Sequence, residues 1–216
     1  MAYLGVGFAG LGHMGIGMAT NLQRHLRANP TPEYNPSLRV WNRSREKAAP
    51  LTTELGSVSV ADAGDLAACS ITFLMLLNDA AVEAVVTEYL SRRRELPGGG
   101  PSGAVIVDCS TVLPATTARL AAAAAEAGVS YCACPVWGRP DAAAAGRLMA
   151  CLAGGDAGVR RRLRPLVDAF AQRNVWALGD DPTAAHAAKL AGNHFIMSQI
   201  QSVSEVLALG KSGALG

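Results

Sequence analysis

Short apolar runs alternate with segments of helical periodicity along most of the chain. Runs such as residues 71–76 show no polar alternation, which is typical of strands that are buried on both faces of a sheet. The pattern predicts strands over residues 3–9, 38–41, 58–60, 71–76, 104–108, 129–133, 148–153 and 175–178. It predicts helices over residues 14–27, 45–55, 62–68, 79–90, 114–127, 157–172 and 182–211.

This alternation predicts an α/β fold, a Rossmann-type doubly wound and mainly parallel sheet, followed by one long C-terminal helix. The last helix would hold roughly 30 residues and measure about 45 Å, which is longer than a helix that only covers a sheet requires. We therefore expect it to have a partner surface, and we predict a homodimer built on it. Its apolar stripe contains Ile196, Ile200, Val203 and Leu207.

Composition excludes several classes of protein. Half of the 216 residues are apolar and 17% are charged, which is incompatible with an intrinsically disordered chain. A net charge of +2 gives no strong field for nucleic acid. No segment reaches the roughly 18 apolar residues that a membrane span needs, and the N-terminus lacks the basic region of a signal peptide. We expect a cytoplasmic protein that binds neither nucleic acid nor a membrane.

The five cysteines show neither disulfide-framework spacing nor zinc spacing. Cys132 and Cys134 would point to one face of a strand, but no second Cys or His pair completes a metal site. We predict reduced thiols in the core and no metal; a metal pair at these two residues is the alternative.

The strongest local signal is G-L-G-H-M-G at residues 10–15, a G-x-G-x-x-G pattern between a predicted strand and a predicted helix. This context is the one that a dinucleotide site requires, although a structural glycine turn is the alternative. The first glycine would permit a tight turn, the second would let the backbone approach the pyrophosphate, and the third would let helix and strand pack closely. The predicted cofactor contacts are Gly10, Leu11, Gly12, His13, Met14 and Gly15.

The end of the second predicted strand indicates which nucleotide binds. An NAD site places an acidic residue there, where it binds the ribose hydroxyls. This strand ends instead in Asn42, Arg43 and Ser44, and a guanidinium and a hydroxyl suit a 2′-phosphate. We expect NADP(H) to be preferred over NAD(H), with Arg43 as the main phosphate ligand and the other two assisting. A basic surface turn is the alternative.

Several further short motifs occur along the chain. They are F-A-G-L-G-H-M-G at residues 8–15, M-A-T-N-L at 18–22, M-L-L-N-D-A-A-V at 75–82, D-C-S-T-V at 108–112, P-V-W-G-R-P at 135–140, K-L-A-G-N at 189–193 and a helix end at 205–213. Together they resemble the β-hydroxyacid dehydrogenases, which include 3-hydroxyisobutyrate dehydrogenase and the cofactor domain of 6-phosphogluconate dehydrogenase. The resemblance implies reversible hydride transfer between nicotinamide and a small β-hydroxyacid or semialdehyde-type acid.

The resemblance also implies roles for single residues. Lys189 would be the proton donor and acceptor, a role that burial favours because it moves the pKa of a lysine toward neutrality. Asn193 would share its helix face, orient it and hold a substrate oxygen. His186 and His194 are alternative general acids.

Two more of the family's motifs concern the substrate and the adenosine side of the cofactor. Ser110 would bind the substrate carboxylate or hydroxyl, and Thr111 would reach the nicotinamide ribose; a helix-capping role before Pro114 is the alternative. The loop assigned to the adenosine side contains Met75, Leu76, Leu77 and Val82.

The clearest departure from the family lies at Gly138 and Arg139, where two glycines are usual. Arg139 either clamps a substrate carboxylate or projects into solvent. We assign both residues to a small carboxylic acid substrate, and the bulky Trp137 is compatible with a larger or more acidic one. Imine reductases of the same superfamily generally lack the catalytic lysine, so Lys189 argues against that activity.

The resemblance finally suggests how the chain is divided. Residues 1–181 would form the NAD(P)-binding domain, and residues 182–216 would form the long helix with which an all-helical C-terminal domain starts. Because the family's members continue through that domain, we expect most of it to be missing from this sequence. The alternative to an enzyme is a non-catalytic NADP-binding module that acts in assembly or sensing.

Overall fold

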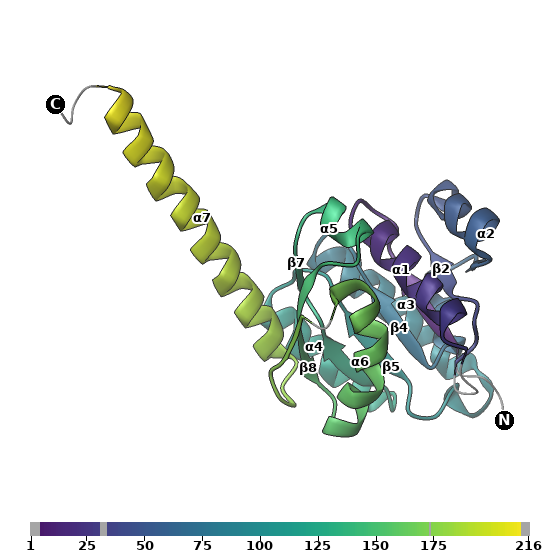
Figure 1. The fold of residues 1–216 in the computed structure, drawn as a ribbon. Helices are drawn as coiled ribbons and strands as arrows, with labels where there is room; N and C mark the ends of the chain where they lie inside the picture. The colour runs from purple at the N-terminus through teal and green to yellow at the C-terminus, as the bar shows by residue number, and fades with distance from the viewer. Residues whose placement is uncertain (1–4, 31–33, 173, 213–216) are drawn as a thin grey trace.

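The parallel strands of the sheet end at one common edge. The computed structural model describes residues 5–30, 34–172 and 174–212 (Figure 1). Its strands are β1 (Val6–Ala9), β2 (Arg39–Trp41), β3 (Val58–Ser59), β4 (Ile71–Leu74), β5 (Val105–Asp108), β6 (Ser130–Ala133), β7 (Val136–Trp137), β8 (Met149–Gly154) and β9 (Val175–Ala177). In this described part they form one sheet in the order β3-β2-β1-β4-β5-β6-β8-β7, and β9 pairs with β8. β1 to β6 are parallel, whereas β8 runs antiparallel to β6 and β7.

Helices cover both faces of this sheet. They are α1 (Gly15–Ala28), α2 (Ala49–Leu55), α3 (Asp79–Glu95), α4 (Pro114–Glu126), α5 (Pro140–Ala144), α6 (Ala157–Ala171) and α7 (Thr183–Lys211), with 3-10 turns η1 (Arg45–Ala48), η2 (Ala63–Ala68) and η3 (Pro97–Gly99). α1 and α6 share one hydrophobic core with the sheet, and α3 and α4 share a second core on the other face. The arrangement confirms the doubly wound, mainly parallel fold that the sequence predicts.

Successive residues of the central strands serve the two cores alternately. In β4, Ile71 and Phe73 belong to the core under α1 and α6, whereas Leu74 belongs to the core under α3 and α4. Phe73 also lies between Phe8 and Phe170, with ring centroids 6.3 and 6.0 Å apart. Because both faces are covered, most positions of such a strand are apolar, which explains the apolar runs in the sequence. Thr72 of β4 is a buried polar exception, and its hydroxyl donates to the Leu66 carbonyl oxygen at 3.2 Å.

The predicted elements differ from the structure in several places. The strand predicted over residues 71–76 ends at Leu74, and the helix predicted over residues 45–55 begins as the 3-10 turn η1. The segment predicted as a helix over residues 62–68 is the 3-10 turn η2, and α3 extends to Glu95 instead of residue 90. Neither β7 nor α5 was predicted, because two strand residues and five helical residues are too short to produce a periodic pattern. Residues 3–4 of the first predicted strand and residues 213–216 lie outside the described residues.

α5 is held in place by contacts with α1. The Asn21 side-chain amide donates hydrogen bonds to the carbonyl oxygens of Ala143 and Ala144 at 2.9 and 3.1 Å. Gly17 lets the two helices approach, because a Cβ atom there would lie 2.7 Å from the Ala144 nitrogen. The position of α5 therefore depends on residues about 120 positions away, for which its own sequence carries no signal.

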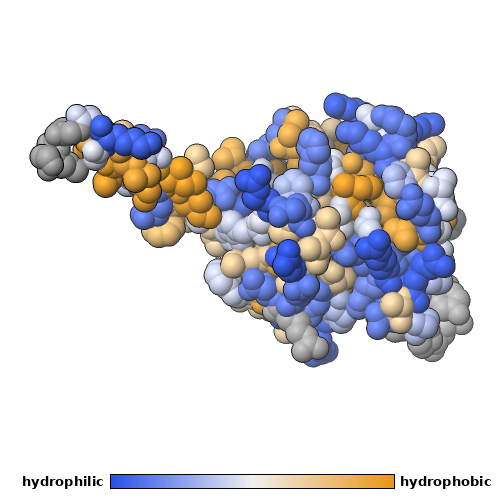
Figure 2. Space-filling model, turned by 45° about the horizontal axis from the view of Figure 1, so that its top comes forward, coloured by the Kyte–Doolittle hydropathy of each residue, from blue (hydrophilic) through white to orange (hydrophobic). Residues whose placement is uncertain are grey.

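α7 lies against the body only at its N-terminal end and then projects away from it (Figure 1). Ala185, His186 and Lys189 are buried, whereas all the described residues from His194 onward are exposed. Apolar side chains gather along one side of the projecting part and polar ones along the other (Figure 2). No helix among the described residues combines the length and the hydropathy that crossing a membrane requires.

Candidate functional site

The glycine-rich turn between β1 and α1 is tightly packed at its first and third glycines. Gly10 has a φ of +100°, and its N–H donates to the Trp41 carbonyl oxygen at 2.9 Å. A Cβ atom on Gly15 would lie 1.9 Å from the Gly10 carbonyl oxygen. Both positions therefore need glycine for the backbone itself, in agreement with the roles predicted for a tight turn and for close packing.

Gly12 is different, because a Cβ atom there would meet no atom within 4 Å. This glycine lies on the wall of a cleft of about 510 Å³ at the edge where the parallel strands end. A volume of this size falls in the range of small-molecule sites. The open space over Gly12, above the free N–H groups of the α1 N-terminus, is the cradle that a pyrophosphate needs. The cleft is lined by Gly10, Gly12, Trp41, Asn42, Arg43, Ser44, Lys47, Met75, Leu76, Leu77, Asn78, Ala80, Ala81, Ala84 and Val85.

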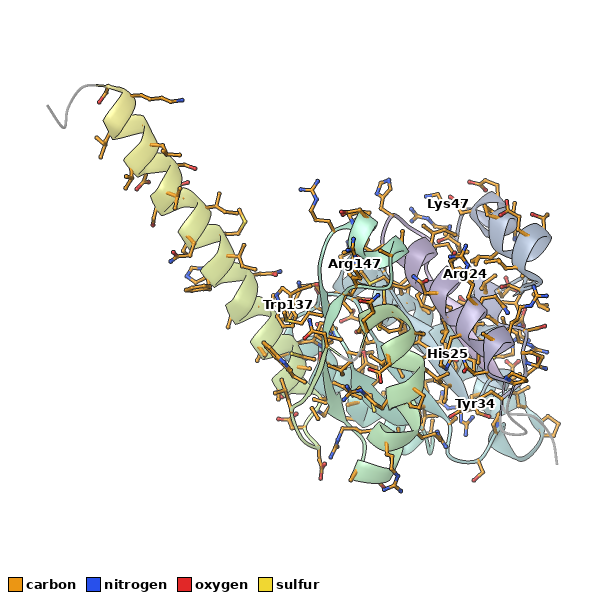
Figure 3. All side chains as sticks on the ribbon, viewed as in Figure 1. Arg24, His25, Tyr34, Lys47, Trp137 and Arg147 are labelled. Atoms are coloured by element: carbon orange, nitrogen blue, oxygen red, sulfur yellow. The ribbon has the colours of Figure 1, made fainter. Side chains whose placement is uncertain are left out.

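Two cationic side chains stand at one end of this cleft. Arg43 was predicted to bind the phosphate, and Lys47, on the 3-10 turn η1 that follows, was missed. Figure 3 shows Lys47 beside α2. Arg45 does not line the cleft, because its guanidinium donates to the Ala61 carbonyl oxygen at 3.1 Å. The cleft thus offers two cations and no carboxylate among its described lining residues, which fits a phosphate.

The Asn42 side chain joins β2 to the glycine-rich turn. Its Oδ1 accepts from the Leu11 N–H at 2.7 Å, and its Nδ2 donates to the Ser44 carbonyl oxygen at 2.9 Å. Both ends of the amide are used within the protein. Asn42 therefore fixes the turn on which Arg43 stands, and it has less freedom to contact a phosphate than the prediction assumed.

The other predicted cofactor residues are distributed unevenly. Ser44, Met75, Leu76 and Leu77 line the cleft, and His13 and Thr111 are exposed. Leu11 and Val82 are buried in the two hydrophobic cores, and Met14 packs against one of them. On α3 the residues that line the cleft are Ala80, Ala81, Ala84 and Val85.

Ser110 follows the end of β5 and is completely buried. Its hydroxyl accepts from the Leu76 N–H at 3.0 Å, and its N–H donates to Asp108 Oδ1 at 2.9 Å. Asp108 also accepts from the Tyr131 hydroxyl at 2.9 Å. Ser110 therefore connects β5 to the cleft loop after β4, and its hydroxyl retains a proton that it can donate.

His186 anchors the N-terminal end of α7 to this group. Its Nε2 donates to the Ser110 carbonyl oxygen at 3.1 Å, and its Nδ1 accepts from the Thr117 hydroxyl at 2.6 Å. Burial lowers the pKa of His186, and the Asp108 carboxylate, 4.0 Å from Nε2, opposes that shift. Because both ring nitrogens are engaged, His186 is suited to holding α7 in place and not to transferring a proton. His194, the other histidine considered, is exposed farther along α7.

Lys189 lies one helical turn beyond His186 and is 7% exposed. Burial lowers the pKa of its ammonium group, and the nearby Cys151 opposes that shift. Its Nζ lies 4.7 Å from the centroid of the Trp137 ring. Asn193 is half-buried on the same face but does not hydrogen-bond to Lys189. A partly desolvated lysine is thus held near the end of β7, as proton transfer would require.

Gly138 and Arg139 follow β7 directly, at the start of α5. Gly138 has a φ of +137°, and a Cβ atom there would lie 2.6 Å from a Leu148 side-chain carbon. Arg139 is exposed, and its side chain makes no hydrogen bond or ion pair with the described residues. Gly138 is therefore required by its backbone conformation and its close packing, and the Arg139 guanidinium is available to a ligand.

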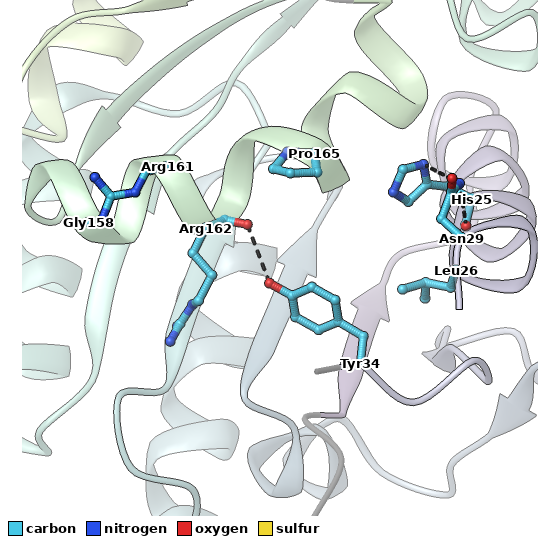
Figure 4. Close-up of a pocket in the computed structure, with 8 residues that line it drawn as sticks. All are labelled: His25, Leu26, Asn29, Tyr34, Gly158, Arg161, Arg162 and Pro165. Carbon is cyan, nitrogen blue, oxygen red and sulfur yellow. Dashed lines mark hydrogen bonds between the residues drawn. The ribbon is translucent and has the colours of Figure 1, made fainter. Parts of the chain in front are cut away.

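A second and larger cavity, of about 620 Å³, lies between the C-terminal end of α1 and the N-terminal half of α6 (Figure 4). In it the Tyr34 hydroxyl donates to the Arg162 carbonyl oxygen at 3.4 Å. Burial lowers the pKa of His25, with Asp168 opposing. None of the predicted site residues line this cavity, and it is remote from the glycine-rich turn, so size alone does not make it the candidate site. Its lining residues are His25, Leu26, Asn29, Tyr34, Gly158, Arg161, Arg162 and Pro165.

The cysteines give no indication of a metal or redox site. All five are buried as free thiols, and burial raises the pKa of Cys69 and Cys132 to about 12 and that of Cys151 to about 11. No group of three or more His, Cys, Asp or Glu in the described residues is arranged to hold a metal ion.

Comparison with known proteins matches most of this chain to one family of NAD binding domains. Residues 5–179 match the NAD binding domain of 6-phosphogluconate dehydrogenase. The uncharacterized oxidoreductase YfjR of Bacillus subtilis is 34% identical over 198 residues, which are 91% of this chain and 63% of that protein. An NAD-dependent L-serine dehydrogenase of Pseudomonas aeruginosa is 31% identical over 210 residues, which are 97% of this chain and 65% of that protein. The chain thus spans less than two thirds of the length of both relatives.

A solved structure shares the fold. Mycobacterium tuberculosis 3-hydroxyisobutyrate dehydrogenase with L-serine gives a TM-score of 0.83 at 23% identity, covering 100% of this chain and 67% of that one. At that identity the likeness concerns the arrangement of the elements.

Proposed function

The chain belongs to the NAD-binding family of the 6-phosphogluconate and β-hydroxyacid dehydrogenases, and on this premise we propose that it is an NADP-dependent oxidoreductase. The proposed substrates are small β-hydroxyacids or the corresponding semialdehyde-type acids. The observation that carries the proposal is the buried Lys189, which lies on α7 one turn after His186. His186 donates a hydrogen bond to the Ser110 carbonyl oxygen, and the Ser110 hydroxyl accepts one from Leu76, which lines the nucleotide cleft.

Individual residues of the chain would have distinct roles in the proposed reaction. The nicotinamide, when bound, supplies the hydride chemistry. In oxidation, the neutral Lys189 amine takes the proton from the substrate hydroxyl. In reduction, its ammonium form donates that proton to the developing alkoxide oxygen. The Asn193 amide would hold a polar group of the substrate, and Thr111 would meet the ribose. Ser110, which is completely buried, would position the loop after β4 through the hydrogen bond from the Leu76 N–H.

The substrate carboxylate would lie near the start of α5. Gly138 and Arg139 there each have a backbone N–H, and Arg139 adds an exposed guanidinium whose fork geometry matches a carboxylate. A substrate with a second carboxylate would suit this pair better than the shortest hydroxyacids do. A panel of hydroxyacids and semialdehydes with one and two carboxylates, followed through NADPH absorbance, tests both activity and size preference. Tight NADPH binding without turnover on any member would favour a non-catalytic binding module.

The preference for NADP(H) rests on the charges of the cleft. Arg43 and Lys47 line the cleft, and none of its described lining residues is a carboxylate that could bind the ribose hydroxyls as in an NAD site. Two cations near one phosphate strengthen the charge-assisted hydrogen bonds that either would make alone. The relative from Pseudomonas aeruginosa is NAD-dependent by name, so the preference must be measured on this chain.

Arg43→Ala is expected to weaken NADPH binding by roughly 10- to 100-fold, the effect of losing a hydrogen bond to a charged group. NADH binding should change less than about threefold, because NADH lacks the 2′-phosphate that Arg43 would contact. Fluorescence titration of each nucleotide measures both affinities. Arg45→Ala is the matched control, since that guanidinium is bonded to the Ala61 carbonyl. Equal loss of both nucleotides in Arg43→Ala would contradict the assignment.

We further infer that the apolar face of α7 is covered by a second copy of the chain. Ile196, Ile200, Val203 and Leu207 are each about half exposed or more, on one side of a helix that projects from the body. A contiguous apolar face of this kind on a long helix is typical of an association surface. The same stripe is the one that the sequence predicts.

Sedimentation velocity at micromolar concentration should therefore show a dimer. The double substitution Ile200→Glu and Leu207→Glu should give a monomer, because burying two carboxylates in an apolar interface is unfavourable. Ser198→Glu with Gln201→Glu adds the same charge to the opposite side of the helix and should leave the dimer intact. A monomeric wild-type protein would rule the inference out.

A further inference from the structure

The ring of Trp137 lies against the base of α7, at the point where this helix meets the body (Figure 3). Lys189 Nζ is 4.7 Å from the ring centroid, within the distance at which an aromatic face attracts a cation. The ring is half-buried and packs against a cluster of small residues on the neighbouring strands and on α7. The contacts with these small residues thus fix the position of the ring, while one face of the ring contacts Lys189.

Gly192 makes room for this ring. It lies three residues after Lys189, so the two share a helix face. A Cβ atom on Gly192 would lie 3.0 to 3.3 Å from three atoms of the Trp137 ring. Glycine inside a helix is less stable than alanine, and Gly210 of the same helix has nothing within 4 Å. Gly192 is therefore explained by the ring and not by the backbone of the helix.

The Trp137 ring also interacts electrostatically with the Lys189 ammonium group. No carboxylate among the described residues forms an ion pair with this ammonium group. Of the elements packed against this part of α7, β8 contributes Cys151, whose pKa of about 11 keeps it an uncharged thiol at neutral pH. β6 and α4 contribute no group that shifts the pKa of Lys189 in the described residues. An ammonium group without a counterion, in a partly desolvated site, gains more from an aromatic face than an exposed one does.

We propose that Trp137 is the positioning residue of Lys189. The ring face holds the ammonium group at the end of β7, next to the Gly138-Arg139 turn, and Gly192 provides the space that the ring needs. The inference rests on the proposed role of Lys189 in proton transfer, which it deepens. It explains why a bulky Trp137 precedes Gly138, and why a glycine interrupts α7 one turn after the lysine.

The charge state of Lys189 can be followed without any turnover. The sequence holds three lysines, Lys47, Lys189 and Lys211, so protein made with ¹³C-lysine gives three Cε signals whose shifts titrate with pH. Trp137→Leu keeps the site apolar but removes the ring face, so the Lys189 midpoint should move to lower pH. Trp137→Phe keeps an aromatic face and should restore most of the wild-type midpoint.

The other two lysines serve as internal references, and Trp176→Leu removes an exposed tryptophan as the matched control. The midpoint of Lys189 in that control should equal the wild-type value. In Trp137→Leu, an unchanged midpoint, or one moved toward the ordinary value of an exposed lysine, would mean that the ring only excludes water. Either result would overturn the proposal.

A second variant perturbs the same contact from the helix. Gly192→Ala should displace the ring and lower the Lys189 midpoint as Trp137→Leu does, even though alanine favours the helix itself. Gly210→Ala changes the same residue type where no neighbour is disturbed, and it should leave the midpoint unchanged. If both alanine variants titrate like the wild type, the glycine has no part in positioning the lysine and the proposal fails.

Turnover provides the final comparison once a substrate is found. Loss of the aromatic face in Trp137→Leu should lower kcat by roughly 3- to 30-fold, from the usual strength of a cation–aromatic contact. KM for the substrate should change little, and Trp137→Phe should rescue kcat. A titration shift without any turnover in the wild-type protein would leave the positioning established and reject the oxidoreductase, so the two failures are distinguishable.

Discussion

Lys189→Met is expected to lower kcat in both directions by roughly 10²- to 10⁴-fold, the usual contribution of a general acid–base group. Methionine retains much of the length and the apolar stem of lysine, so the packing against Trp137 should persist while the exchangeable proton is lost. Steady-state rates with the best substrate of the panel measure the effect. The dissociation constant of NADPH should stay within about twofold, because Lys189 does not line the nucleotide cleft.

The wild-type rates should depend on pH with opposite signs in the two directions. Burial lowers the pKa of Lys189, which brings its titration closer to neutral pH. Oxidation needs the neutral amine, so its rate should rise as the pH increases through that pKa. Reduction needs the ammonium form, so its rate should fall over the same interval. In Lys189→Met both transitions should disappear.

Lys211→Met is the control for removing one positive charge, since that lysine lies exposed at the far end of α7. Its rates and their pH dependence should match those of the wild type. If Lys189→Met retained wild-type kcat with the same pH profile, another residue would have to transfer the proton. The fully bonded His186 would then be the first to re-examine.

Gly15→Ala should destabilise the protein by about 3 kcal/mol or more, at the upper end of the overpacking range. The added Cβ atom would lie 1.9 Å from the Gly10 carbonyl oxygen, so β1 and α1 would have to separate. For a chain of this length, that loss lowers Tm by roughly 6 to 12 °C. Thermal unfolding followed by circular dichroism measures the shift.

Gly12→Ala is the matched variant in the same turn. Its Cβ atom meets nothing within 4 Å, so Tm should stay close to the wild-type value. NADPH binding should nevertheless weaken about tenfold or more, because the methyl group occupies the space of the pyrophosphate. Equal Tm losses in the two variants would show that the turn is a purely structural feature. An unchanged nucleotide affinity in Gly12→Ala would show that the cofactor binds at another place on the protein.

Most of the sheet and its helices could be predicted from the sequence, because local pattern specifies them. The apolar run at residues 71–76 contains the central strand β4, and the long helix predicted over residues 182–211 is α7. The elements that were missed, β7 and α5, have too few residues for a pattern. Their positions come from the pairing of β7 with β8 and from the Asn21 amide that holds α5.

The candidate site divides in the same manner. The glycine spacing at residues 10–15 and the basic end of β2 indicated a dinucleotide site and its charge, since both depend on a few neighbouring residues. The hydrogen bonds that connect the parts of the site could not be predicted from the sequence, because they join residues that are distant in the chain. His186 and Ser110 are 76 positions apart, and Asn42 and Leu11 are 31 apart.

By itself, then, the sequence determined the fold class, the glycine-rich turn and the residue types available for a phosphate and for proton transfer, because periodicity, turn chemistry and charge are local properties. Only the tertiary structure decided which of those residues face a cleft and which face the core. It buried Ser110 and Val82, added Lys47 to the cleft and put the Trp137 ring over Lys189. Burial and contact depend on how the strands and helices pack, and packing joins residues that no local pattern relates.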